Sequence, residues 1–428
     1  MQIQERNDAP LEMRREGNFL TKIFKYLFCI QFLLIMILAF YLTVRGVISA
    51  SDNHRFHQKK WYFPVLSSIV CAGIVGFAWQ LFTSCNPSRA FKATFFISPL
   101  LTCAYGILLV SIGSPGSAAA AVFALVSAVV QSIYACWAHP RFQHASKILV
   151  VSIAYHPPRV KTVVPVSMFV CILYSTILMS GVGGATATGT KLNTLFIVLS
   201  LLSFTWTLQV ARHIMFVTVS HTKFMKFASE TEVQFKTAVR DLVKYTMGSI
   251  CIGSILVPVL GVIRGSARAI SLVSGDVDEF MFSCANCCAG VAKGLVAYGN
   301  RWGFVQVGVY HKGIVQASKD TWEMFRRIGI EKLINTDLTS SFCFLSGVLA
   351  GSFCALVAGT WALLVHKSYA TEVSLYTFLA GYLVNRVAMA WIQASVAAYY
   401  VAYAENPQNQ QFDGTVPDYI QALQRLQG

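Results

Sequence analysis

Three polar side chains share one face of an apolar segment, where they could contact a small ligand inside a membrane. The segment covers residues 203–213 and reads Ser-Phe-Thr-Trp-Thr-Leu-Gln-Val-Ala-Arg-His. On a helix, Trp206, Gln209 and His213 follow the i, i+3, i+7 spacing and therefore lie on one face. The stripe predicts part of a substrate path or, in the plainer interpretation, hydrogen bonding between helices. Arg212 lies on a neighbouring face, and we expect it to extend its charge toward the cytosolic interface in a structural role.

A second segment, residues 245–254, combines small residues with a tyrosine at its start, Tyr245. The small residues are Gly248, Ser249, Gly253 and Ser254. They permit close helix packing, and Pro258, which follows, is expected to kink the helix. Small residues beside a kink also leave room for a ligand or a moving gate. Gly248, Gly253 and Pro258 are therefore predicted to act in gating or packing.

One arginine falls within a long apolar stretch near the C-terminus. Arg386 follows Asn385 in that stretch. A central arginine is costly in a bilayer and rarely faces lipid. We expect it to pair with carbonyl groups or helix ends, with a role in excluding or orienting ions as the alternative.

The sequence contains little evidence for a metal site or for an enzyme active site. The motif Cys284-x-x-Cys287-Cys288 lacks the second Cys or His pair of a zinc site. The chain has no HExxH, no Gly-x-Ser-x-Gly and no phosphate loop. The sequence predicts no catalytic residue, no metal and no cofactor.

The elements that carry these residues are apolar and long. Only 12% of the 428 residues are charged, and the mean hydropathy is +0.56; soluble domains have about 25% charged residues. A spanning helix needs about 20 apolar residues. Nine stretches qualify: 26–45, 61–83, 93–113, 117–138, 163–183, 193–219, 244–263, 339–366 and 374–403. The sequence therefore predicts an all-α polytopic transmembrane protein.

A tenth crossing is expected within 280–316, which would give about ten spanning helices. The surrounding stretch 264–336 mixes charged residues with Gly, Val and Phe. It fits surface helices and one broken or re-entrant crossing, so its topology stays open. Amphipathic patterns over 139–162 and 221–242 predict helices on the cytosolic surface.

The chain is expected to form a single transmembrane domain over 26–404, between polar tails at 1–25 and 405–428. Lys and Arg are concentrated on the side of the N-terminus, which predicts that this end is cytosolic. An even number of crossings then places the C-terminal tail in the cytosol as well. The net charge of +15 is explained by this orientation and by attraction to anionic lipid, so nucleic acid is not an expected partner.

None of the nine stretches contains Asp or Glu. Proton- and cation-coupled carriers often use such carboxylates as relays or counter-ions. A quaternary ammonium has no proton to donate, and aromatic faces attract it by about 0.5–2 kcal/mol each. The missing carboxylates therefore favour an aromatic cage for a permanently charged cation.

The second half of the chain resembles the choline transporter-like family. The resemblance is carried by Phe204-Thr205-Trp206-Thr207, by residues 245–254, and by the stretch from Cys287-Cys288 through Tyr298-Gly299-Asn300 to Ala317-Ser318. The chain resembles the short members found in plants and fungi, because only residues 46–60 occupy the place of the large first extracellular loop.

The resemblance implies facilitated or exchange transport of choline, ethanolamine or a related small organic cation, rather than enzymatic activity. The predicted lining residues are Trp206, Gln209, His213, Tyr245, Ser249, Tyr298 and Asn300. Trp206 and a tyrosine would supply cation–π faces, and Gln209 and Asn300 would bond the substrate hydroxyl.

The expected location is the plasma membrane, with an endomembrane as the alternative, and membrane lipids are the expected partners. A non-transporting scaffold or trafficking protein stays open, as does a membrane lipid-metabolism enzyme. The oligomeric state and the coupling ion stay open too.

Overall fold

The structure is a computed structural model that describes residues 11–52, 57–154, 160–188, 192–229, 235–273, 298–409, 412 and 414–425. Throughout these ranges the regular structure is helical, and no strand occurs in them. The prediction of an all-α protein is confirmed.

Ten long helices form most of the part of the chain that the structure describes. They are α1 (Leu11–Asp52), α2 (Gln58–Cys85), α3 (Pro87–Ile112), α4 (Pro115–Ala138), α6 (Val160–Thr188), α7 (Asn193–Ser229), α9 (Met247–Val273), α14 (Thr339–Val365), α15 (Ala370–Ala388) and α16 (Ala390–Glu405). The shorter elements are η1 (His139–Arg141), α5 (Phe142–Ala154), α8 (Phe235–Asp241), η2 (Leu242–Thr246), α11 (Gly303–Tyr310), α12 (Ile314–Ile328), α13 (Glu331–Asn335), η4 (Lys367–Tyr369) and α17 (Thr415–Arg425).

All nine predicted spans fall on helices long and apolar enough to cross a membrane. Eight such helices occur among the described residues, and α15 with α16 forms a ninth, bent span. Large apolar side chains lie exposed along them; on α4 these are Val122, Phe123, Val126, Val129, Val130 and Ile133. Lipid is the solvent that such a surface requires. The tenth crossing expected within 280–316 falls partly on 280–297, outside the described residues, and its remaining part contains the short helix α11 and the beginning of α12.

Local sequence explains the sharp turn between α3 and α4. Gly113 ends α3 with φ +73°, a left-handed conformation that glycine adopts without a Cβ penalty. The Oγ of Ser114 then accepts a hydrogen bond from the Ser117 N–H at 3.1 Å, and Pro115 occupies the first helical position. The two helices therefore pack as neighbours.

The last span differs from the prediction in two ways. The stretch 374–403 was expected to be one helix, but α15 and α16 are bent by 42° at the break after Ala388. The span also begins earlier, so Glu372 lies in the first turn of α15. The absence of carboxylates noted for 374–403 therefore does not hold for the helix that actually forms.

The two expected amphipathic surface helices have different outcomes. Residues 142–154 form α5, which buries Phe142, Ala145 and Leu149 and exposes Lys147. In contrast, a separate helix over 221–242 is wrong, because residues 221–229 continue α7. The apolar positions of that segment prolong the face already buried by the preceding turns.

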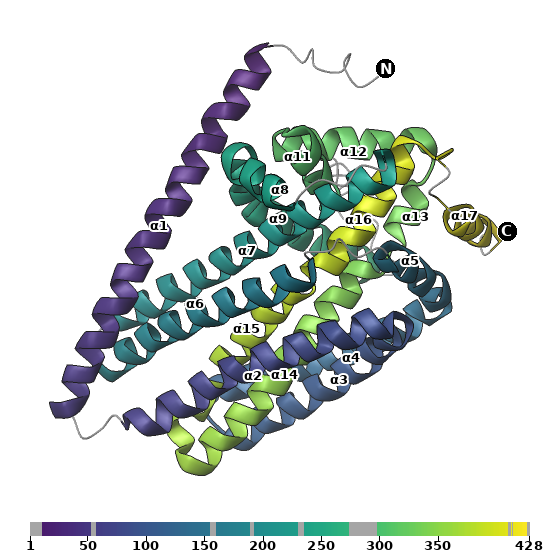
Figure 1. The fold of residues 1–428 in the computed structure, drawn as a ribbon. Coiled ribbons are helices and arrows are strands. Elements are labelled where there is room, and N and C mark those ends of the chain that lie inside the picture. The colour runs from purple at the N-terminus through teal and green to yellow at the C-terminus, as the bar shows by residue number, and fades with distance from the viewer. Residues whose placement is uncertain are drawn as a thin grey trace. The chain divides into compact units, whose positions relative to one another are not determined.

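The chain divides into two compact units. The larger unit comprises Gln31–Met215, Thr336–Val396 and Gly414–Gly428; the smaller comprises Met1–Ile30, Phe216–Asn335 and Ala397–Asp413. In the larger unit α2 packs against α6, α14 and α15, and α14 also packs against α3 (Figure 1). In the smaller unit α11 packs against α12, which contacts α9. Each unit positions part of the predicted site.

Candidate functional site

The predicted polar stripe of α7 lies in the larger unit, and its members are buried to different degrees. His213 is 2% exposed, whereas Trp206 and Gln209 are partly exposed. The Oε1 of Gln209 accepts a hydrogen bond of 3.0 Å from Nη1 of Arg212. The oxygen of the amide that was expected to bond a substrate hydroxyl is therefore already engaged by its helical neighbour.

Arg212 is the centre of a chain of polar side chains that crosses the larger unit. It is 8% exposed, and its Nη2 donates a 2.6 Å hydrogen bond to Oε1 of Gln393. The Nε2 of Gln393 donates in turn to Oγ of Ser340 at 2.9 Å. The expectation that Arg212 extends to the interface is wrong, because its guanidinium binds inside the unit. We call the chain Gln209–Arg212–Gln393–Ser340 the α7–α16–α14 polar chain.

This polar chain meets the break in the last span. Along α14, Ser340 bonds Gln393, and the Sγ of Cys343 lies 4.0 Å from the carbonyl oxygen of Met389, the residue at the break. A Cβ added to Gly347 would lie 3.0 Å from Cδ of Arg386. One face of α14 therefore follows both arms of the bent span.

Asn385 is fully buried, and Arg386 is partly buried with its Nε and Nη1 shielded from solvent. Neither Nδ2 nor Oδ1 of Asn385 has a hydrogen-bond partner among the described residues, and the same holds for the buried Nε and Nη1 of Arg386. The expected pairing of Arg386 with carbonyl groups is therefore not found for these two atoms. Both Arg386 and Arg212 lie within electrostatic range of His213. A cation bound against His213 would face positive charge and would need a carboxylate elsewhere in the unit.

The other predicted lining residues lie in the smaller unit. Tyr245 belongs to the π-helical turn η2, an element that often marks functional sites. Its ring is 55% exposed, with Nζ of Lys244 4.9 Å from the ring centroid and the His311 ring 5.4 Å away. Ser249 is buried, at 4% exposure. A cation of the protein itself, Lys244, thus already lies over the aromatic face that was predicted for the substrate.

The predicted gating residues occupy positions of close packing. A Cβ on Gly248 would lie 2.0 Å from the carbonyl oxygen of Thr21, and a Cβ on Gly253 would lie 2.5 Å from the Phe304 ring. Helix α9 continues through Pro258. These contacts establish packing for both glycines, and gating stays a prediction.

Asn300 holds the start of α11 against α12. Its Nδ2 donates to the carbonyl oxygen of Ser318 at 2.9 Å, and its Oδ1 accepts from the Gly303 N–H at 2.8 Å. Tyr298 is 47% exposed, with Nζ of Lys319 4.7 Å from its ring centroid. Both ends of the Asn300 amide therefore serve the fold, while substrate contact by Asn300 and Tyr298 stays a prediction.

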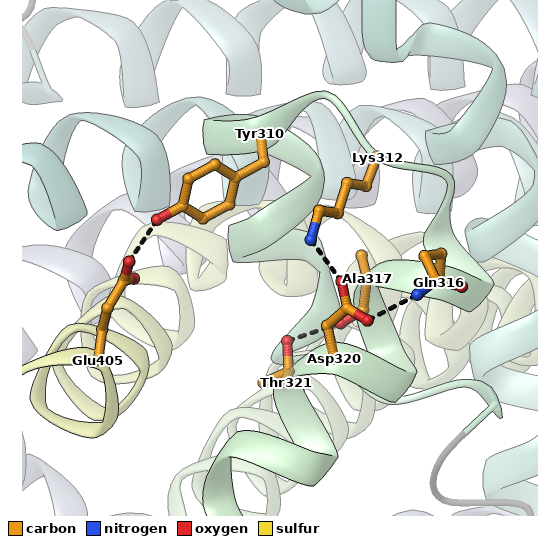
Figure 2. Close-up of polar contacts among 7 residues, drawn as sticks. All are labelled: Tyr310, Lys312, Gln316, Ala317, Asp320, Thr321 and Glu405. Atoms are coloured by element: carbon orange, nitrogen blue, oxygen red, sulfur yellow. Dashed lines mark hydrogen bonds and ion pairs between the residues drawn. The ribbon is translucent and has the colours of Figure 1, made fainter. Parts of the chain in front are cut away.

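Further polar contacts involve the end of α11 and the first half of α12. Figure 2 shows Tyr310 donating to Glu405 at 2.6 Å, and Lys312 paired with Asp320. Gln316 also donates to Asp320, at 2.7 Å. These contacts join the end of α11 to α16 and the α11–α12 connection to α12.

Asn300→Ala is expected to lower the free energy of unfolding by about 1–3 kcal/mol, because two buried hydrogen bonds are lost. Thermal unfolding of the detergent-solubilised protein measures the loss. Ser318→Ala should cost less, since it removes only the Oγ that accepts from the Asn300 backbone N–H. Unchanged stability of Asn300→Ala, with a raised KM for a transported substrate, would favour substrate contact instead.

No group of three His, Cys, Asp or Glu side chains that could hold a metal ion occurs among the described residues. The Cys284, Cys287 and Cys288 cluster lies outside them. The structure therefore does not test that motif.

Comparison with known proteins gives a family match over most of the chain. A family model described as "Plasma-membrane choline transporter" matches residues 93–408. "Protein PNS1" of Mycosarcoma maydis is 24% identical over 80% of this chain and 70% of its own length.

Two further fungal relatives match over shorter stretches. "Protein PNS1" of Cryptococcus neoformans (strain JEC21) is 28% identical over 38% of this chain and 31% of its own length. "Protein PNS1" of Saccharomyces cerevisiae is 24% identical over 40% and 34%, respectively. These two matches span about a third of each relative.

Proposed function

Because the chain belongs to the choline transporter-like family, we propose that it carries choline or a related small organic cation, such as ethanolamine, across a membrane. The family and the nine candidate spans make it a multi-pass membrane protein with a transporter-type role. We propose three things beyond the family match. The substrate is an organic cation, the transport mode is facilitated or exchange, and the location is the plasma membrane. The family description "Plasma-membrane choline transporter" supports the organic cation and the location.

The observation that carries the proposal is the broken span with a polar chain beside it. Backbone breaks at membrane depth are tolerated where protein or a wet cavity surrounds them, and they commonly mark transport sites. Here the break at Met389 is flanked by the α7–α16–α14 polar chain. Trp206 lies on the same helix as this chain and offers an aromatic face to a cation.

Uptake of labelled choline into vesicles containing the purified full chain tests the proposal. We expect flux above that of empty vesicles, and we expect Trp206→Ala to raise KM by about 2- to 30-fold through loss of one cation–π face. Trp361→Ala is the matched control, because Trp361 is 43% exposed on a span of the same unit.

Equal background flux in wild type and Trp206→Ala would reject transport of this substrate. The polar chain would then serve only as helix–helix hydrogen bonding in a scaffold or trafficking protein. Chemical turnover of lipid without net flux would instead point to a membrane enzyme.

A further inference from the structure

A carboxylate and three aromatic rings meet where α2 and α15 begin, inside the larger unit. Trp61 and Tyr62 lie in the first turn of α2. Glu372 lies in the first turn of α15, and Tyr376 follows one turn later at i+4 on the same face. We call these four residues the Glu372 cluster. None of them was singled out from the sequence.

Two rings of the cluster, those of Trp61 and Tyr62, pack against α6. The Trp61 ring centroid lies 6.4 Å from that of Tyr376 and 5.1 Å from that of Tyr62. The Tyr62 hydroxyl donates to the carbonyl oxygen of Ser180 at 3.2 Å. A Cβ on Gly183 would lie 2.5 Å from the Trp61 ring and 2.6 Å from the Tyr62 ring. The rings of Trp61 and Tyr62 are therefore held in position in the absence of a ligand.

One oxygen of the Glu372 carboxylate lacks the hydrogen-bond partner that a buried charged atom needs. Its Oε2 is buried and has no hydrogen-bond partner among the described residues, and no described residue forms an ion pair with it. The Trp61 indole approaches the carboxylate, and Tyr376 lies within its electrostatic range. The helix dipole favours an acid in a first turn, but it does not compensate the burial of one oxygen.

The donor set indicates the kind of cation that would compensate this charge. Ca²⁺ and Mg²⁺ require six or more oxygen ligands, and the cluster offers one carboxylate. A carboxylate beside ring faces is the environment that suits an organic ammonium group, since the carboxylate balances the charge and the rings attract it. The residue as a whole is only partly buried, whereas its Oε2 is buried.

We propose that Trp61, Tyr62, Glu372 and Tyr376 bind the ammonium group of a small organic cation. The inference rests on the proposed function, because it supplies the counter-charge that a transported cation requires. Glu372 and Arg386 lie fourteen residues apart on α15, about 21 Å along the helix. The bound cation is thereby kept away from the positive charge of Arg386.

The charge distribution also predicts on which side of the membrane the Glu372 cluster lies. The Lys and Arg distribution predicts a cytosolic N-terminus, which puts the connection between α1 and α2 on the opposite face. The beginning of α2 then lies on the non-cytosolic side. The Glu372 cluster is thus placed to receive a cation from outside the cytosol.

Two readouts on the purified full chain test the proposal: the choline concentration that gives half-maximal thermal stabilisation in detergent, and choline uptake in vesicles. Glu372→Gln is expected to raise that concentration at least about tenfold, because the balancing charge is lost while the side-chain shape is kept. Tyr376→Leu should raise it by about 2- to 30-fold by removing a ring face. Glu405→Gln is the matched control, since Glu405 lies outside the cluster and its oxygen can still accept from Tyr310.

The outcomes separate this inference from transport itself. Choline uptake with an unchanged KM in Glu372→Gln and Tyr376→Leu would contradict cation binding by the Glu372 cluster. It would not contradict choline transport. If choline stabilises the protein in a way that depends on Glu372, but wild type shows no choline flux, cation binding by the Glu372 cluster is supported and choline transport is rejected. Failure of choline either to stabilise or to cross the membrane would reject both for this cation. Should Glu372→Gln not fold, Tyr376→Leu alone decides, and wild-type affinity in that variant overturns the proposal.

Discussion

Gly184→Ala is expected to leave the protein unable to pair α1 with α6 in the larger unit. A Cβ at position 184 would lie 2.0 Å from the Leu42 carbonyl oxygen, and a Cβ on Gly46 would lie 2.3 Å from the Gly184 Cα. Because both neighbours are backbone atoms, no side chain can rotate away, and the helices must separate by about 1 Å or more. Overpacking costs about 1–3 kcal/mol, occasionally more, and small residues at such contacts let membrane helices pack.

Thermal unfolding and size-exclusion profiles of the solubilised variant measure this effect. Gly116→Ala is the control, since its Cβ would meet only a methyl carbon of Thr371 at 3.9 Å. That variant should equal wild type or gain a few tenths to about 1 kcal/mol from better helix propensity. If Gly184→Ala is as stable as Gly116→Ala, the two helices do not approach as closely as the structure shows.

Arg212→Ala is expected to cost about 2–5 kcal/mol and to lower choline uptake more than tenfold. The change removes two charged hydrogen bonds and leaves the buried Oε1 of Gln393 without its donor. The α7–α16–α14 polar chain is then cut beside the break at Met389. Unfolding midpoints and initial uptake rates, each normalised to folded protein, measure the two effects.

Two further variants test whether the bond to Gln393 is the cause. In a double-mutant cycle with Gln393→Ala, the losses should be less than additive, with a coupling of about 0.5–3 kcal/mol. Arg89→Ala removes an exposed arginine of the same unit and should change stability by no more than about 0.5 kcal/mol. Additive losses at Arg212 and Gln393 would contradict the polar chain.

Much of the fold was predictable because lipid exposure leaves a strong local signal. A run of about 20 apolar residues must be helical in a bilayer, since no water satisfies its backbone. The nine spans therefore needed no tertiary information. The end of a span is less certain, because a helix can extend beyond its apolar run; α15 does so, which brings Glu372 into the span.

The candidate site was predicted less completely, because its contacts join residues far apart in the chain. Arg212 and Gln393 are 181 positions apart. The residues around either one do not indicate that the other lies beside it in the fold. The same is true of Trp61 and Glu372, which begin different helices. For Asn300 the residue type suggested a substrate contact. In the structure its side-chain amide instead forms hydrogen bonds with the Ser318 carbonyl oxygen and the Gly303 N–H.

Hydropathy and motifs are local properties of a chain, so the all-α membrane fold and the resemblance to the family could both be recognised without tertiary information. Tertiary structure alone decided which polar groups meet: Arg212 with Gln393, and Glu372 with three rings. A buried charge in a bilayer must be compensated by whatever the fold brings beside it. The nature of that partner depends on helix packing, which no single stretch of sequence encodes.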